Sequence, residues 1–159
     1  MPSLNDVEKD AQGCCDYLEN MSPAYRGGFE RQKQDYQINP EALEKIEKYL
    51  EDFSIVVVFA DWCGDARRAV PVLAIIEEMT GKKIPARGGM TKPPYGSDRN
   101  WAVPPSPQEV DAFYITSSPT ILIFNKEGEE IGRIKTRQKM TPTIEEEIVK
   151  IIEDSLNKN

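Results

Sequence analysis

Residues 59–66 read Phe-Ala-Asp-Trp-Cys-Gly-Asp-Ala and place a cysteine directly between a hydrophobic strand and a helix. The preceding residues Ile55–Phe59 are all apolar, as expected for a strand buried on both faces of a sheet. The following residues predict a helix over 64–80 that ends at Gly81. A helix start offers unpaired backbone N–H groups and the positive end of the helix dipole, and both stabilise a thiolate. Cys63 is therefore the candidate nucleophile; the alternative is a small apolar residue at a strand end.

The rest of the chain predicts an α/β fold with a mixed sheet. A helix begins at Asn39-Pro40, where a capping side chain precedes a proline at the first helical position. A capping box at 106–109 opens a short helix that ends near Tyr114. The remaining expected elements are a weak strand over 83–87, a hairpin of strands over 120–124 and 130–135, and a final helix that starts at Thr141-Pro142.

Residues 1–38 form a predicted helical extension before the main domain, which spans 39–159. Within the extension, Leu4 to Asn20 has helical spacing of apolar residues. Segment 21–38 is rich in charges and contains proline and glycine, so it is interpreted as a polar connection. No Gly/Ser-rich linker divides the chain, and its 159 residues are enough to bury a full core.

The composition excludes several classes of site. The chain has no histidine, so neither a Ser-His-Asp triad nor a Cys-His dyad is available. Its three cysteines, two of them adjacent, cannot alone complete the ligand set of a structural zinc ion. Glycine-rich phosphate loops of the common patterns are absent from the sequence, and the glycine pairs at 27–28 and 88–89 are interpreted as turns. We therefore expect no metal and no cofactor.

Cys14 and Cys15 lie in the predicted amino-terminal helix and are interpreted as small buried residues. The alternative is that one of them resolves a disulfide formed on Cys63, and we expect that it does not. The cysteine pattern is not a secreted disulfide framework, which indicates a reducing compartment.

Charge and hydropathy limit the partners and the location. The formal net charge of −7 argues against nucleic acid and anionic membranes, because both would repel the protein. The sequence contains no apolar run of the length of a membrane span, and residues 1–10 lack the basic and apolar regions of a secretory signal. The expected location is the cytoplasm. The sequence leaves the oligomeric state open.

Separated pieces of the chain resemble the thioredoxin family. In chain order they are Ile55–Ala60 as the central strand, Asp61–Gly64 as the approach to the redox site, Pro71 as the kinking proline of the long second helix, Ser118–Thr120 as the cis-proline turn, and Lys126–Glu129 as a hairpin turn. The resemblance covers about residues 40–156. It implies a thioredoxin-like fold, with a central mixed sheet flanked by helices.

The chain departs from the family where the redox chemistry is set. Ala66 stands where dithiol members carry a second cysteine, so Cys63 cannot close a local disulfide. Val57 stands where thioredoxins usually place a buried acid that serves that second thiol. The resemblance is therefore to a monothiol branch with a Trp-Cys-Gly-Asp site.

Asp65 is a third departure, because it occupies the usual proline position. Its negative charge next to the cysteine disfavours a thiolate, while Arg67 and Arg68 offset it. The net effect is not fixed by the sequence.

An insert over about 90–105 lengthens the usual connection between the third strand and the cis-proline. Reactive groups in α/β sheets collect at the carboxyl ends of parallel strands, and the insert leaves a strand next to the one that ends at Cys63. Tyr95, Arg99 and Trp101 are therefore candidate gating residues. The alternative is a passive surface loop.

The resemblance implies thiol–disulfide exchange through Cys63, with protein or low-molecular-weight thiols and disulfides as partners in cell redox homeostasis. The implied substrate-binding residues are Trp62, Gly64, Asp65, Ser118 and Pro119. The main alternative is a non-catalytic module that keeps the groove and binds peptides or proteins. A carrier like the monothiol glutaredoxins is disfavoured, because Cys-Gly-Asp-Ala differs from the Cys-Gly-Phe-Ser pattern of that group.

Overall fold

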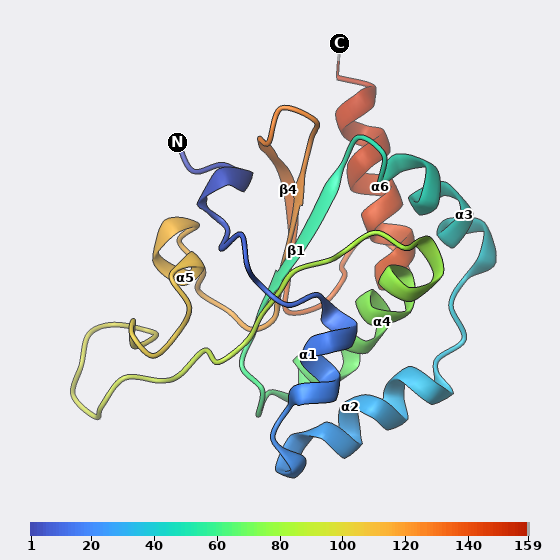
Figure 1. The fold of residues 1–159 in the computed structure, drawn as a ribbon. Helices are drawn as coiled ribbons and strands as arrows, with labels where there is room; N and C mark the ends of the chain where they lie inside the picture. Colours follow the sequence, from blue (N-terminus) through green and yellow to red (C-terminus); the bar gives the residue numbers. More distant parts are fainter. Residues whose placement is uncertain (159) are drawn as a thin grey trace.

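The computed structural model describes residues 1–158 and contains a four-stranded sheet (Figure 1). In spatial order the strands are β2 (Ala86–Arg87), β1 (Ser54–Val58), β3 (Thr120–Phe124) and β4 (Glu130–Lys135). β1 is parallel to β2 and antiparallel to β3, and β3 is antiparallel to β4. The predicted mixed sheet is confirmed, and both strands of the hairpin have the predicted bounds.

Helices cover one face of the sheet. α4 (Gly64–Thr80) and α6 (Ile144–Leu156) pack against the strands, and α3 (Pro40–Tyr49) packs on α6. α1 (Cys14–Asn20) and α2 (Pro23–Asp35) pack on α4, farther from the sheet (Figure 1). α3 and α4 begin as predicted, whereas α6 begins after the predicted start, with Thr143 as its cap.

The opposite face of the sheet is covered by the insert, by α5 (Glu109–Ala112) and by the amino-terminal segment with the 3₁₀ helix η1 (Leu4–Asp6). Two hydrophobic clusters lie on the two faces of the sheet. Ile55 and Val57 of β1 pack in the first cluster, under the helices. Val56 and Val58 pack in the second cluster, on the opposite face. Successive side chains of β1 therefore enter different cores, which explains why the strand is apolar from Ile55 to its end.

The expected single helix over 4–20 is wrong between η1 and α1. The Cys14 N–H donates to the Ile84 carbonyl at 2.9 Å, and the Ala86 N–H donates to the Gln12 carbonyl at 2.9 Å. The segment before α1 thus runs beside β2 and satisfies backbone groups at the edge of the sheet. This long-range pairing overrides the local helical spacing.

Segment 21–38 is not a polar connection, because it contains α2. Ser22 caps this helix by accepting a hydrogen bond from the Ala24 N–H, and Pro23 takes the first helical position. The same cap-and-proline signal correctly located α3. Gly27 and Gly28 lie inside α2 and are not a turn, although each glycine costs a helix about 1 kcal/mol relative to alanine.

The predicted capping box at 106–109 is also wrong. Its serine bonds to the backbone N–H of Thr91, and α5 begins without a side-chain cap. The carboxylate of Glu109 is buried and accepts hydrogen bonds from Arg87 Nε at 2.9 Å and from the Glu8 N–H at 2.8 Å. The acidic side chain thus joins distant segments instead of capping its own helix.

A single carboxylate fastens the amino-terminal region to the rest of the fold. Glu77, near the end of α4, accepts hydrogen bonds from the N–H groups of Cys14 at 3.1 Å, Cys15 at 2.8 Å and Ile84 at 2.7 Å. It therefore caps the start of α1 and holds the residues that lead into β2. A Cβ on Gly13 would collide with this carboxylate, so the close approach requires glycine there.

We expect Glu77→Ala to lower the free energy of unfolding by about 2–4 kcal/mol, because several N–H groups lose a charged acceptor. Glu78→Ala is the matched control, since Glu78 is exposed and pairs with Lys33 at the surface, and its loss should cost under about 1 kcal/mol. Urea unfolding followed by circular dichroism measures both. Equal losses would contradict the anchoring role of Glu77.

Candidate functional site

Cys63 lies where β1 passes into α4. It is the N-cap residue of that helix, with φ −79° and ψ 127°, and its N–H donates to the Ala60 carbonyl at 3.1 Å. The side chain is partly buried and packs against both hydrophobic clusters. α4 is 17 residues long, so the positive end of a full helix dipole lies at the thiol. The predicted position of the cysteine at a helix start is confirmed.

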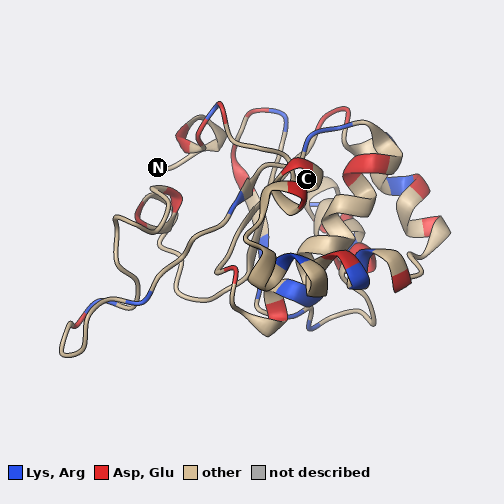
Figure 2. Ribbon diagram, turned by 60° about the horizontal axis from the view of Figure 1, so that its bottom comes forward, with Lys and Arg blue, Asp and Glu red and all other residues tan. Residues whose placement is uncertain are grey.

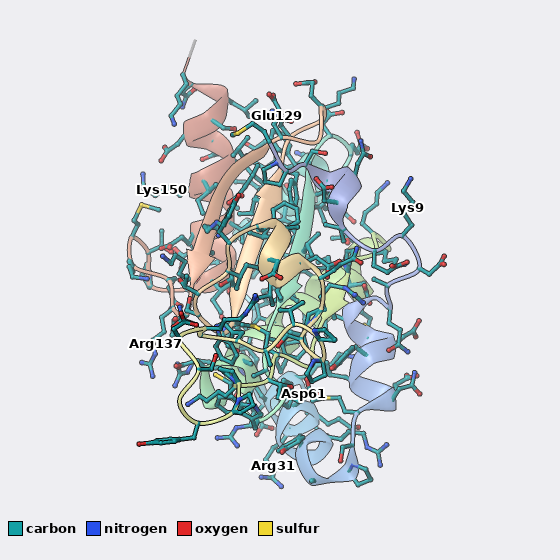
Figure 3. All side chains as sticks on the ribbon, turned by 90° about the vertical axis from the view of Figure 1, so that its left-hand side faces the viewer. Lys9, Arg31, Asp61, Glu129, Arg137 and Lys150 are labelled. Carbon is teal, nitrogen blue, oxygen red and sulfur yellow. The ribbon has the colours of Figure 1, made fainter. Side chains whose placement is uncertain are left out.

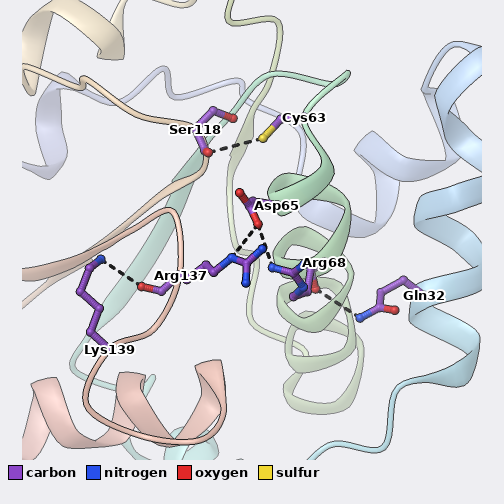
Figure 4. Close-up of polar contacts among 7 residues, drawn as sticks. All are labelled: Gln32, Cys63, Asp65, Arg68, Ser118, Arg137 and Lys139. Carbon is purple, nitrogen blue, oxygen red and sulfur yellow. Dashed lines mark hydrogen bonds and ion pairs between the residues drawn. The ribbon is translucent and has the colours of Figure 1, made fainter.

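The residues before β3 lie against the thiol (Figure 4). Cys63 Sγ donates to the Ser118 carbonyl oxygen at 3.4 Å, and Ser118 Oγ accepts a hydrogen bond from the Ala60 N–H at 2.8 Å. The peptide bond between Ser118 and Pro119 is cis. The structure thus brings the candidate residues from the two parts of the chain together.

The Trp62 side chain lies beside the cysteine and is exposed to solvent, with 48% of its surface accessible. Its ring centroid lies 6.3 Å from that of Trp101, at an interplanar angle of 31°. Lys92 Nζ lies 5.4 Å from the Trp62 ring centroid, within the range of a cation–π contact. Trp101 itself is only 8% exposed and belongs to the second hydrophobic cluster. The insert therefore reaches the site through the largely buried Trp101 and through Lys92.

The two other expected gating residues lie differently. Arg99 donates from Nε to the Trp101 carbonyl at 3.1 Å and from Nη2 to Asp111 at 2.6 Å, so it ties the insert to α5. Tyr95 is completely exposed and packs against nothing. Of the three candidates, the structure brings only Trp101 to the site.

The Asp65 carboxylate is held by two arginines (Figure 4). Its Oδ1 accepts from Arg68 Nη1 at 2.7 Å and from Arg137 Nε at 2.9 Å. Arg68 was an expected partner, whereas Arg137 comes from the loop after β4 and gives no local signal in the sequence. Two cations on one carboxylate leave a net positive charge in this group, at the first turn of the helix that begins at the thiol.

Cys14 and Cys15 lie in α1 as free thiols. Burial raises the pKa of Cys14, and the nearby Glu77 charge raises it further. The Cys15 thiol donates to the Ala74 carbonyl at 3.3 Å, and burial together with Glu77 raises its pKa to about 12. Both environments keep these thiols protonated at neutral pH, unlike the environment of an attacking or resolving cysteine.

Tyr17 and Asp61 form a hydrogen bond that was not predicted from the sequence. The Tyr17 hydroxyl lies 2.8 and 2.9 Å from the two carboxylate oxygens of Asp61, and the Gly89 N–H donates to the same carboxylate at 3.1 Å. Burial and this hydrogen bond raise the pKa of Tyr17. A Cβ on Gly88 would collide with the Tyr17 hydroxyl, so the close packing requires glycine. The hydrogen bond between Tyr17 and Asp61 joins α1 to the residue before Trp62.

Figure 3 shows Asp61 in the part of the molecule away from Glu129, toward Arg31. Glu129 lies in the β3–β4 hairpin turn, whereas Asp61 follows β1. The site therefore lies where β1 leaves the sheet.

Comparisons with known proteins support the fold. The family model described as Thioredoxin matches residues 12–87, just under half of the chain. A crystal structure of a protein of unknown function from Pseudomonas aeruginosa is similar with a TM-score of 0.70 at 13% identity, covering 98% of this chain and 99% of that one. A crystal structure of an HIV epitope scaffold is similar with a TM-score of 0.64 at 11% identity, covering 91% and 94%. No curated protein matches the sequence significantly.

The chain has a thioredoxin-like fold, as predicted. At these identities the likeness to the solved structures concerns the fold alone. In the part of the chain that the structure describes, residues 1–158, no three Cys, Asp or Glu side chains are grouped so that they would hold a metal ion. None of the helices within these residues is long and apolar enough to cross a membrane.

Iodoacetamide treatment of the native protein at neutral pH should label Cys63 first, because Cys14 is fully buried and the pKa of Cys15 is raised to about 12. Peptide mapping by mass spectrometry over a time course measures the order. The unfolded protein is the control, in which all three cysteines should be labelled at similar rates. Labelling of Cys15 as fast as Cys63 in the native protein would contradict this assignment.

Proposed function

We propose that this protein carries out thiol–disulfide exchange through a single nucleophilic cysteine, Cys63, and forms mixed disulfides with thiol or disulfide partners. The observation that supports this most is the position of Cys63 Sγ at the start of α4, 3.4 Å from the Ser118 carbonyl. The partly buried thiol meets the dipole of a long helix there and lies beside an exposed tryptophan.

The reaction begins when the Cys63 thiol gives its proton to solvent. The thiolate attacks the nearer sulfur of the partner disulfide, a new sulfur–sulfur bond forms, and the old one breaks. The leaving thiolate takes the electron pair and picks up a proton. Cys63 is oxidised to a mixed disulfide and one sulfur of the partner is reduced, so the step needs no further oxidant.

The neighbouring residues have separate roles in this proposal. Trp62 flanks the thiol, and Gly64 leaves the approach to it open. The backbone of Ser118, before Pro119, pairs with an extended partner segment. Asp65 holds two arginines near the thiol. The substrate-binding roles follow from the resemblance to the thioredoxin family and from the placement of these residues around Cys63.

Ala66 determines how the cycle ends. It lies one helical turn after Cys63, where dithiol proteins carry the resolving thiol, and its side chain is buried. An outside thiol must therefore release the mixed disulfide. We place this chemistry in the cytoplasm, where the thiol pool is reducing. A non-catalytic module that binds partners in the same groove is the competing proposal, and the reactivity of Cys63 separates the two.

Dithiobis(nitrobenzoate) should form a stable mixed disulfide on Cys63, whereas insulin reduction with a dithiol reductant should show little turnover, because no resolving thiol is adjacent. Intact mass spectrometry detects the adduct. Cys63→Ser should abolish it, and Cys15→Ser, which removes a thiol whose pKa is raised, should leave it unchanged. Absence of any adduct on the folded wild-type protein would favour the binding module.

Ala66→Cys should raise insulin turnover, but only partly, because Val57 still stands in place of the acid that serves a resolving thiol. Ala69→Cys is the matched control: it adds a sulfur to another buried position of α4 that lies farther along the helix from Cys63. Turnover rates and the unfolding midpoint of each variant are measured together. Equal turnover of the two folded variants would argue against an exchange site at the start of α4.

A further inference from the structure

A groove of about 620 Å³ lies between α2 and the start of α4. Its lining consists of Gly28, Arg31, Gln32, Asp35, Tyr36, Gly64, Arg67 and Arg68. One lining residue, Gly64, directly follows the candidate nucleophile Cys63 in the sequence, whereas Cys63 itself is not part of the lining. Three of the lining residues are arginines and only one, Asp35, is acidic. This local charge is opposite to the net charge of −7 of the whole chain.

Because α2 packs on α4, the side chain of Arg67 lies along this groove. A Cβ on Gly28 would lie 2.6 Å from Arg67 Cδ, so the arginine stem passes directly over that glycine. A Cβ on Gly64 would lie 3.9 Å from Arg67 Nη2, which places the guanidinium next to the residue after Cys63. The absence of a side chain at Gly28 therefore leaves room for the Arg67 stem, and the guanidinium lies beside Gly64, the residue that follows Cys63.

The charges of the groove are largely uncompensated. Within residues 1–158, neither Arg31 nor Arg67 has a carboxylate partner within ion-pair distance. Arg68 shares the Asp65 carboxylate with Arg137. Figure 2 shows basic and acidic residues interspersed along the helices.

From this arrangement we infer that the groove binds the carboxylates of a low-molecular-weight thiol or disulfide while its sulfur meets Cys63; this rests on the proposed exchange function. Guanidinium groups bind carboxylates through paired N–H donors, and Arg67 and Arg31 are free to do so. The volume of about 620 Å³ falls in the range of small-molecule sites. Arg67 is thus a specificity-determining residue.

The test compares two disulfide probes, the dianion dithiobis(nitrobenzoate) and the uncharged dithiodipyridine, by stopped-flow at low ionic strength. Arg67→Gln should lower the rate with the dianion relative to the uncharged probe by about fivefold, the effect of one nearby charge in water. Arg31→Gln should act in the same direction. Arg26→Gln is the matched control, because Arg26 lies on α2 but pairs with Glu30 outside the groove.

A second pair of variants tests the path of Arg67 without removing a charge. Gly28→Ala places a methyl group against the Arg67 stem and should lower the preference for the dianion. Gly27→Ala is its control, because nothing lies within 4 Å of a Cβ there. Alanine is favoured over glycine in a helix by about 0.5–1 kcal/mol at both positions, and only Gly28→Ala must also displace the flexible Arg67 side chain. Thermal unfolding checks that each variant is folded.

The outcomes separate the groove from the exchange function. If the wild-type protein reacts with neither probe, the exchange function fails, and this inference fails with it. If Cys63 reacts with both probes and Arg67→Gln leaves their ratio unchanged, the groove does not select anions and only this inference is overturned. A ratio lowered equally by Arg26→Gln would also overturn it, because it would reflect the net charge of the protein and not the groove.

Discussion

The antiparallel pairing of β1 with β3 is the constraint on which the site depends. Its register sets Val58 opposite Thr120, so the chain that leaves β1 must run against the chain that enters β3. The hydrogen bond from the Ala60 N–H to Ser118 Oγ extends this contact beyond the sheet. Cys63 and the residue before Pro119 are neighbours because of this pairing, although more than fifty positions separate them.

Hydrophobicity alone does not set that register. A slip by one residue normally exposes a strand's apolar side chains, but after their first residues, Ser54 and Thr120, β1 and β3 are apolar and buried on both faces. Side-chain shape in two separate cores and the polar contact at Ser118 therefore decide it. The same polar contact that fixes the register also positions the candidate site, so the two are not independent.

Local signals in the sequence were enough to predict the strand and helices that form the middle of the fold. The apolar run of β1, the cap before α3 and the glycine that ends α4 in a left-handed conformation all act within a few residues. Prediction failed where a distant segment changes the local preference. The residues before α1 pair with the edge of the sheet, and the acidic residue of the supposed capping box binds Arg87.

The charge environment of the site also could not be predicted from neighbouring residues in the sequence. Asp65 was expected to oppose a thiolate, and its neighbours in sequence gave no way to decide the balance. Arg137 reaches it across 72 positions, and this makes the group around Asp65 net positive. The loop that carries Arg137 is held in turn by Glu147, whose buried carboxylate accepts hydrogen bonds from the N–H groups of Lys139 and Met140. The net charge near the thiol thus depends on a loop that is distant in sequence, and no local pattern in the sequence connects that loop with Cys63.

The amino-terminal helices α1 and α2 contact the site in two separate places. α1 holds the residue before Trp62 through the hydrogen bond between Tyr17 and Asp61, and α2 provides the glycine over which Arg67 passes. Leu18 and Phe29 of these helices pack in the same hydrophobic cluster as the residues of α4. α2 also lines the groove beside α4. In the proposed exchange reaction, these amino-terminal helices would therefore distinguish one thiol partner from another.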